Sequence, residues 1–217
     1  MSIANNVVKI KSTLPEQVLL VAVSKTKPIS DLMEGYEAGQ RIFGENKIQE
    51  MEEKWEQMPK DIQWHMIGHV QTNKVKFMAQ FVDLIHGVDS FKLLQEINKQ
   101  ALKHHRIIDC LLQVHIAVEE TKFGLDEEEL AYLLSSTEIQ ELKNIRIVGL
   151  MGMATFTDNK DQIKKEFIYL KSIFDQIAIQ NSQFTILSMG MSGDYELAVE
   201  CGSTMVRIGS SIFGGRN

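Results

Sequence analysis

A lysine at the end of an apolar run is the first candidate for chemistry in this sequence. The stretch LLVAVSKTKP, residues 19–28, is typical of a strand that leads to Lys25. Successive side chains of a strand point to opposite faces, so Val21, Val23 and Lys25 share one face. If the valines fill a barrel, the amine of Lys25 projects into its mouth, where a neutral amine can attack a carbonyl carbon. A solvated lysine at a strand terminus is the commoner case, and this stretch alone does not exclude it.

Two stretches rich in glycine and serine have the composition of an anion-binding site. SMGMSGD, residues 188–194, offers the hydroxyl of Ser192 just before a helical stretch. RIGSSIFGG, residues 207–215, offers the backbone N–H groups of Gly209 and Ser210. Backbone N–H groups at a helix start, together with a hydroxyl donor, suit a phosphate monoester. The alternative for the first stretch is a flexible loop followed by a helix N-cap.

Arg207 adds a charged group to the same predicted region. Strand alternation turns its side chain to the face of Met205 and Gly209, toward the barrel mouth near Lys25. A buried guanidinium needs a partner, because burying an unpaired charge is unfavourable. A nucleophilic lysine, an anion site and a strand arginine match an aldehyde, a phosphate ester and a pyridine nitrogen, which pyridoxal 5′-phosphate (PLP) combines. Burial and the nearby cation would also favour the neutral amine of Lys25.

Eight short apolar runs must position these residues, and they alternate with helical patterns. Leu94, Ile97 and Leu102 recur at helical spacing within 91–105, and 126–136 opens with acidic residues that favour a helix N-terminus. Parallel strands joined by single helices predict an α/β fold, a (β/α)8 TIM barrel whose functional residues lie at the C-terminal ends of its strands. The predicted strands are 19–24, 41–44, 62–68, 82–88, 107–116, 145–153, 184–191 and 205–214.

Composition sets the outer limits on function. Residues 1–217 are 44% hydrophobic and 24% charged, which suits a single domain. The formal net charge of −6 argues against nucleic-acid binding, which needs clustered Lys and Arg. Cys110 and Cys201 lack CxxC spacing, so neither a disulfide nor a zinc site is expected. No window approaches about 18 consecutive apolar residues, and the N-terminus has no signal core, so a cytoplasmic protein without a membrane partner is predicted.

Longer motifs carry a resemblance to a known family. The chain contains, in order, AVSKTKP, FGENKIQE, WHMIGHVQTNK, TKFGL, GLMGM and LSMGMSGDYELAVECGSTMVRIGSSIFG. With this order and spacing the sequence resembles the pyridoxal phosphate homeostasis proteins, which are relatives of the N-terminal barrel of alanine racemase. The resemblance implies a Schiff base between PLP and Lys25, a pyridine nitrogen that faces Arg207, and a site lined by Asn46. It also implies that the phosphate is held by Ser192, Gly209 and Ser210.

The family resemblance implies a role in vitamin B6 and amino-acid homeostasis without an established reaction. Alanine racemase uses a tyrosine as second acid/base, with the help of a C-terminal β domain and a second subunit. We expect that domain to be missing here, because the sequence stops at GGRN, and the four tyrosines lie in helical stretches. An arginine at the pyridine nitrogen also weakens the ring as an electron sink. We therefore predict a monomeric, non-catalytic PLP carrier without catalytic residues, with PLP-dependent apoenzymes as candidate recipients.

The sequence leaves two alternative functions open. The first is a small PLP-dependent enzyme, such as an amino-acid racemase, with Lys25 as its single base. The second is a phosphosugar-binding barrel without PLP, which would explain the anion site but leaves Lys25 and Arg207 without a shared role.

The remaining signals have simpler explanations. His65 and His69 form HxxxH, but the strand-like residues around them do not place both on one helical face, so a structural histidine is expected rather than a metal site. The acidic run 126–129 is interpreted as a solvated helix start. Lys47 and Gly152 depart from the family pattern, since relatives often carry an aromatic residue and a threonine at these positions.

Overall fold

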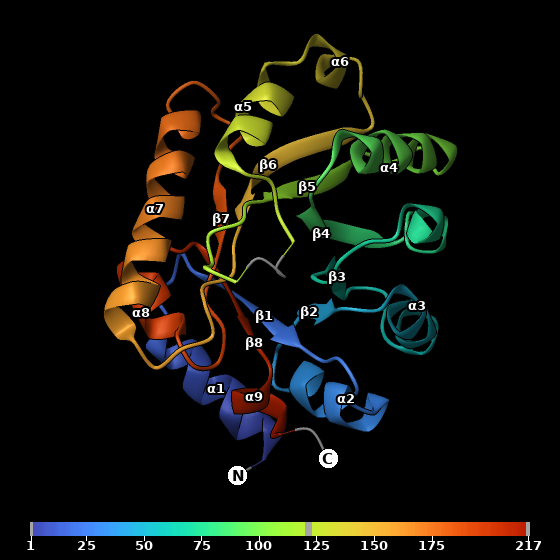
Figure 1. Ribbon diagram of the computed structural model, residues 1–217. Helices are drawn as coiled ribbons and strands as arrows, with labels where there is room; N and C mark the ends of the chain where they lie inside the picture. The colour runs from blue at the N-terminus through green and yellow to red at the C-terminus, as the bar shows by residue number, and fades with distance from the viewer. Residues whose placement is uncertain (1, 120–122, 216–217) are drawn as a thin grey trace.

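A closed barrel of eight parallel strands forms the protein in the computed structural model, which describes residues 2–119 and 123–215. The strands are β1 (Leu19–Val23), β2 (Ile42–Glu45), β3 (Gln63–Met66), β4 (Val82–Val88), β5 (Ile108–Gln113), β6 (Ile145–Met151), β7 (Ile186–Ser188) and β8 (Met205–Ile208). They follow one another in sequence order, and β1 pairs with β8 to close the ring (Figure 1). The predicted TIM barrel is confirmed. Parts of the TKFGL and GGRN motifs, at 121–122 and 216–217, lie outside the described residues.

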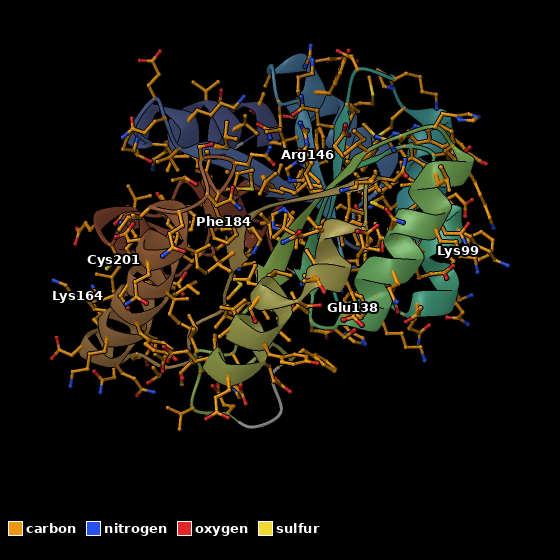
Figure 2. The ribbon with its side chains drawn as sticks, turned by 90° about the horizontal axis from the view of Figure 1, so that it is seen from above. Lys99, Glu138, Arg146, Lys164, Phe184 and Cys201 are labelled. Atoms are coloured by element: carbon orange, nitrogen blue, oxygen red, sulfur yellow. The ribbon has the colours of Figure 1, made fainter. Side chains whose placement is uncertain are left out.

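Helices surround the barrel and connect its strands (Figure 1). They are α1 (Ile3–Thr13), α2 (Ile29–Glu37), α3 (Ile48–Gln57), the 3-10 helix η1 (Thr72–Phe77), α4 (Phe91–Lys103), α5 (Glu127–Ser135), α6 (Thr137–Gln140), α7 (Lys160–Ala178), α8 (Tyr195–Glu200) and α9 (Ser210–Phe213). Figure 2 shows Lys99, Glu138 and Lys164 on the outer helices, where charged side chains meet solvent. Within residues 2–119 and 123–215, no helix is both long and apolar enough to cross a membrane.

The side chains of each strand divide between two cores. The inside of the ring is filled by Val21, Leu84, Leu111, Val148, Met151 and Met205. Leu20 and Ala22 belong to the larger core between strands and helices, so the alternation predicted for β1 is confirmed. Burying an aliphatic side chain of this size contributes about 1.5–3 kcal/mol, which makes the register of each strand hard to shift.

The end of the eighth strand differs from the prediction. Sequence patterns predict a strand over 205–214, but β8 ends at Ile208. The carbonyl of Gly209 accepts hydrogen bonds from the backbone N–H groups of Ile212 and Phe213, each at 2.9 Å. These bonds start the short helix α9, so the apolar residues after Gly209 pack from a helix rather than from a strand.

Two predicted helices are present, with one change of face. In α4, Leu94 and Ile97 are buried as expected, but Leu102 is 57% exposed and Ala101 takes the buried position instead. Positions 94, 97 and 101 follow the helical repeat more closely than 102 does. The acidic run starts α5, where Asp126 forms a capping box, so the helix-start interpretation is confirmed.

Candidate functional site

A cavity of about 780 Å³ opens among the residues that follow the C-terminal ends of the strands. Its size lies within the range of about 300–1,000 Å³ that is usual for small-molecule sites. The cavity brings together all the predicted site residues: Lys25, Asn46, Ser192, Arg207, Gly209 and Ser210. A smaller cavity of about 310 Å³ lies near Lys11 and Arg41 at the opposite end of β1 and β2, and none of the predicted residues lines it.

Lys25 lies in a tight turn directly after β1. The strand ends at Val23, earlier than the sequence suggests, but Val23 and Lys25 both line the cavity as the alternation predicts. Thr26 adopts a left-handed backbone conformation with φ of 63°. This conformation is uncommon for a β-branched residue, and such residues gather at functional sites. The half-buried Lys25 is therefore presented by a constrained turn rather than by a flexible chain.

Arg207 is a buried cation in the cavity wall, and its side chain is on the face of β8 that it shares with Met205. Its Nη1 donates to the carbonyl and the hydroxyl oxygen of Ser188, at 2.9 and 2.6 Å, and its Nη2 donates to the carbonyl of Gly152 at 3.1 Å. Burial lowers the pKa of Arg207 to about 10, and the charge of Asp194 opposes that lowering. The guanidinium is therefore charged at neutral pH, and a ring nitrogen that meets it must be an acceptor.

A buried row of polar side chains continues from Arg207 into the barrel, and we call Arg207, Ser188, His86 and His65 the Arg207 chain. His86 Nδ1 lies 3.1 Å from Ser188 Oγ, and His86 Nε2 lies 3.0 Å from His65 Nδ1. Since Arg207 can only donate to Ser188 Oγ, the serine hydroxyl can donate to His86 Nδ1. His86 then donates from Nε2 to His65. His65 is a hydrogen-bonded structural histidine, as predicted.

Burial keeps both histidines of the Arg207 chain neutral. The pKa of His65 is lowered to about 3 by burial. Burial also holds the pKa of His86 well below its usual range, with smaller contributions from His65 and Arg207. Local sequence patterns give little sign of the Arg207 chain, because His86 and Ser188 lie inside apolar strand patterns and meet only across the closed ring.

The predicted phosphate loops meet at the end of β8. Ser192 Oγ accepts hydrogen bonds from the backbone N–H groups of Gly209 and Ser211, at 3.2 and 3.5 Å. Asp194 occupies the N-cap position of α8 without a side-chain cap bond to that helix, and its carboxylate accepts from the N–H of Met191 at 2.5 Å. The amide and hydroxyl groups at this end of the cavity have the chemistry that a phosphate monoester requires.

Asn46 follows β2 and presents an amide that fits a polar ligand. Its Oδ1 is buried and accepts no hydrogen bond from the described residues. A Cβ atom at Gly68 would lie 2.5 Å from the carbonyl oxygen of Asn46, so only glycine allows the chain after β3 to pass this closely. A buried acceptor of this kind is normally satisfied, and a bound polar group would satisfy it.

The two departures from the family pattern point away from the cavity. Lys47 is exposed at the start of α3. A Cβ atom at Gly152 would lie 2.7 Å from Leu170 Cδ2 and 2.9 Å from Ile116 Cδ1, in the layer under α7. The glycine at 152 therefore alters packing behind the wall, while its carbonyl still accepts the hydrogen bond from Arg207.

Part of the cavity wall has no signal in the sequence. His69 stacks on Phe123 with ring centroids 4.1 Å apart, and its Nδ1 lies 3.3 Å from Asp89. Gln113 and the 95% exposed Phe156 also line the cavity. These residues come from loops and strand ends without a repeating pattern, so no periodicity could have gathered them.

Fold and site together define a βα barrel with a small-molecule site at the C-terminal face of its strands. Residues 1–217 match the family described as alanine racemase, N-terminal domain. Pyridoxal phosphate homeostasis proteins from Aquifex aeolicus and Haemophilus influenzae are each 40% identical, over 91% and 92% of this chain and 86% of their own length. The chain therefore belongs to the pyridoxal phosphate homeostasis protein family.

Solved structures agree with this family and with the fold. PipY from Synechococcus elongatus is 34% identical over 98% of this chain and 100% of its own, with a TM-score of 0.92 without PLP and 0.89 with PLP bound. Alanine racemase from Bartonella henselae, at 18% identity, matches 99% of this chain and 62% of its own with a TM-score of 0.72, which supports the barrel fold alone.

Proposed function

We propose that this protein binds PLP as a Schiff base on Lys25 and serves as a non-catalytic carrier in PLP and amino-acid homeostasis. The observation that carries the proposal is the convergence of Lys25, Arg207 and the Ser192 loop on one cavity. PipY, a relative of this chain, has been solved with PLP bound. PLP would supply an aldehyde, and the residues of the cavity would bind and orient it.

Each part of the cavity has a distinct proposed task. Lys25 provides the amine, whose neutral form is the nucleophile. Ser192, Gly209 and Ser210 provide hydroxyl and amide donors for the phosphate. Asn46 provides an amide to a polar group of the ring. By these assignments, Lys25 reacts with the aldehyde of the cofactor, while Ser192, Gly209 and Ser210 anchor its phosphate.

Arg207 favours binding over turnover. A charged guanidinium donates hydrogen bonds and cannot accept one, so it holds a facing pyridine nitrogen unprotonated. An unprotonated ring draws electrons less strongly, which disfavours chemistry that builds negative charge on a bound amino acid. Arg207 is therefore suited to a carrier more than to an amino-acid enzyme.

The tyrosines give a second argument for a carrier. They all belong to the described residues and lie in helices α2, α5, α7 and α8, and none of them lines the cavity. A racemase needs a second proton carrier opposite its lysine.

We propose a monomeric, cytoplasmic protein that exchanges PLP with PLP-dependent apoenzymes.

An absorption experiment tests the proposal. The purified protein and Lys25→Ala are titrated with PLP, and the visible band of the Schiff base is followed before and after reduction with borohydride. We expect a band in the wild type that is lost in Lys25→Ala. The same samples are incubated with amino acids in D2O, and exchange of the α-proton is followed by NMR. Absence of the band in the wild type would refute PLP binding through Lys25, and exchange that depends on Lys25 would favour a PLP-dependent enzyme instead.

A further inference from the structure

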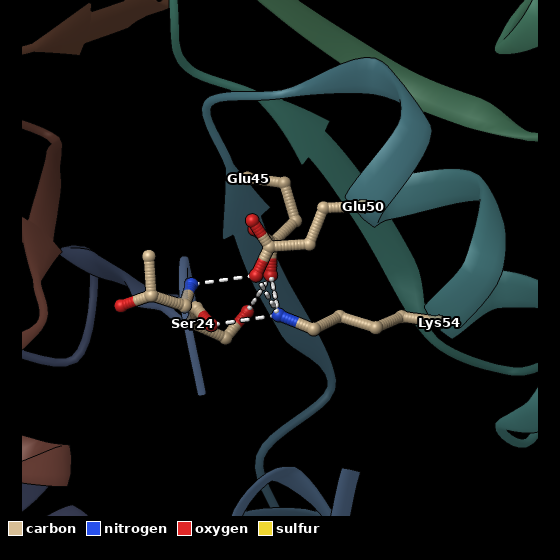
Figure 3. A network of polar contacts seen from close by, with 5 residues as sticks. Ser24, Glu45, Glu50 and Lys54 are labelled. Carbon is tan, nitrogen blue, oxygen red and sulfur yellow. Dashed lines mark hydrogen bonds and ion pairs between the residues drawn. The ribbon is translucent and has the colours of Figure 1, made fainter. Parts of the chain in front are cut away.

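A buried ionic cluster lies behind the turn that carries Lys25, and we call Ser24, Glu45, Glu50 and Lys54 the Lys54 cluster (Figure 3). Lys54 Nζ donates to the carbonyl of Ser24 at 2.8 Å, and to Oε1 of Glu45 and Oε1 of Glu50, each at 2.7 Å. The side chains of Lys54 and Glu45 are 6% and 0% exposed. The ammonium group thus joins β2 and α3 to the end of β1.

The Lys54 cluster contacts the backbone on both sides of Lys25. Before the lysine, the Ser24 carbonyl accepts from Lys54, and the Ser24 hydroxyl donates to Glu45 at 2.6 Å. After the lysine, the N–H of Thr26 donates to Glu50 at 2.5 Å. Thr26 is also the residue with the left-handed backbone conformation. The contact with Glu50 therefore helps to hold the turn in a shape that its sequence does not favour.

Stability alone does not explain this arrangement. Removing an ammonium and a carboxylate from water is unfavourable, and well-packed apolar residues often stabilise a core as well as a buried ion pair does. Glu45 Oε2 is buried and makes no hydrogen bond with the described residues, so the cluster contains a buried acceptor without a donor among them. The cluster instead constrains the backbone around Lys25, because its hydrogen bonds fix the residues on both sides of that lysine.

We propose that the Lys54 cluster is a positioning device that orients the amine of Lys25 toward the aldehyde carbon of PLP. This inference rests on the proposed role of Lys25. In the step that it assists, the lone pair of the neutral amine forms the new C–N bond, and the carbonyl oxygen leaves as water with both amine protons. Ser24, Glu45, Glu50 and Lys54 exchange no proton with the ligand, and they act through the turn.

The test separates reaction with the aldehyde from binding of the rest of the cofactor. PLP measures both, whereas pyridoxine 5′-phosphate, which has an alcohol in place of the aldehyde, measures binding alone. The variants are Glu50→Ala, which removes the acceptor of the Thr26 N–H, and Glu50→Gln, which keeps an oxygen there. The matched control is Glu53→Ala, an exposed glutamate on the same helix. The double variant Glu45→Gln/Lys54→Met removes the two most buried charges of the cluster together and leaves the carboxylate of Glu50, which is 21% exposed.

We expect Glu50→Ala and the double variant to form the visible PLP band at least about tenfold more slowly, because misplaced reacting groups lose rate steeply. Their affinity for pyridoxine 5′-phosphate, measured by calorimetry, should change by no more than about twofold, like that of Glu53→Ala. Glu50→Gln should recover part of the rate. Thermal melting identifies the variants that are folded.

Three outcomes distinguish the positioning role from its alternatives. Slow reaction with intact pyridoxine 5′-phosphate binding supports the positioning role. Reaction at the wild-type rate in folded Glu50→Ala, or an equal loss for both ligands, overturns it. If the wild type itself forms no band that depends on Lys25, the proposed function fails, and this result is distinct from a failure of the positioning role.

Discussion

The Arg207 chain and the Lys54 cluster each bury a cation near the same cavity, but they surround it differently. Arg207 donates to neutral oxygens of Ser188 and Gly152, and two neutral histidines lie behind it. Lys54 is enclosed by two carboxylates and a carbonyl. A cation that is hydrogen-bonded only to neutral groups can still attract an anionic or acceptor group of a ligand. The charge of a cation paired with carboxylates is already neutralised within the protein.

The largest expected effect is the loss of stability on removing the paired cation. Lys54→Met leaves Glu45 buried without its ammonium partner, so we expect a loss of about 3–5 kcal/mol in the free energy of unfolding. Urea denaturation measures the loss. The double variant Glu45→Gln/Lys54→Met should be more stable than Lys54→Met alone. Equal stability of the two variants would mean that Glu45 is not held as an ion by Lys54.

Removing the other cation should have a smaller effect on stability. Arg207→Met removes the donor to Ser188 Oγ and to the carbonyl of Gly152, whereas the carbonyl of Ser188 still accepts from the N–H of Gly152. The oxygens left behind are neutral, so we expect a loss of about 1–3 kcal/mol. The same variant should bind PLP more weakly than the wild type in an absorbance titration. A loss of stability as large as that of Lys54→Met would break the contrast between the two clusters.

The two clusters should also respond to acid in opposite directions. The pKa values of His65 and His86 are lowered by folding, so the unfolded chain binds more protons below pH 6.5, and stability falls as the pH decreases from there. Each histidine contributes up to about 1.4 kcal/mol per pH unit in that range. Burial instead raises the pKa of Glu45, so its protonation favours the folded state as the pH falls through that pKa.

Urea denaturation between pH 5 and 7.5 checks these signs. His86→Gln should flatten the fall in stability on the acidic side, by up to about 1.4 kcal/mol per pH unit. Glu45→Gln should steepen it, because the compensating protonation is lost. An unchanged slope in His86→Gln would show that His86 is not the neutral, buried group that its surroundings indicate.

The strands, Lys25 and Arg207 could be predicted because each leaves a local signal. Val21, Val23 and Lys25 share a face by simple alternation, and Arg207 does so with Met205. The Lys54 cluster leaves no such signal, since Lys54 belongs to a charged helix that is typical of a solvated surface. His86 and Ser188 are brought together only by closure of the ring, and a local pattern cannot report a contact between β4 and β7.

The pairing of β1 with β8 has a consequence for how the site comes into being. Lys25 follows the first strand and the Gly209 turn follows the last, so the two halves of the cavity are made at widely separated times during synthesis. A nascent chain that has folded only its early strands carries the amine without the anion loops. A ligand that needs both halves can therefore bind only after β8 has paired with β1. Its binding would then stabilise the folded protein against separation of these two strands.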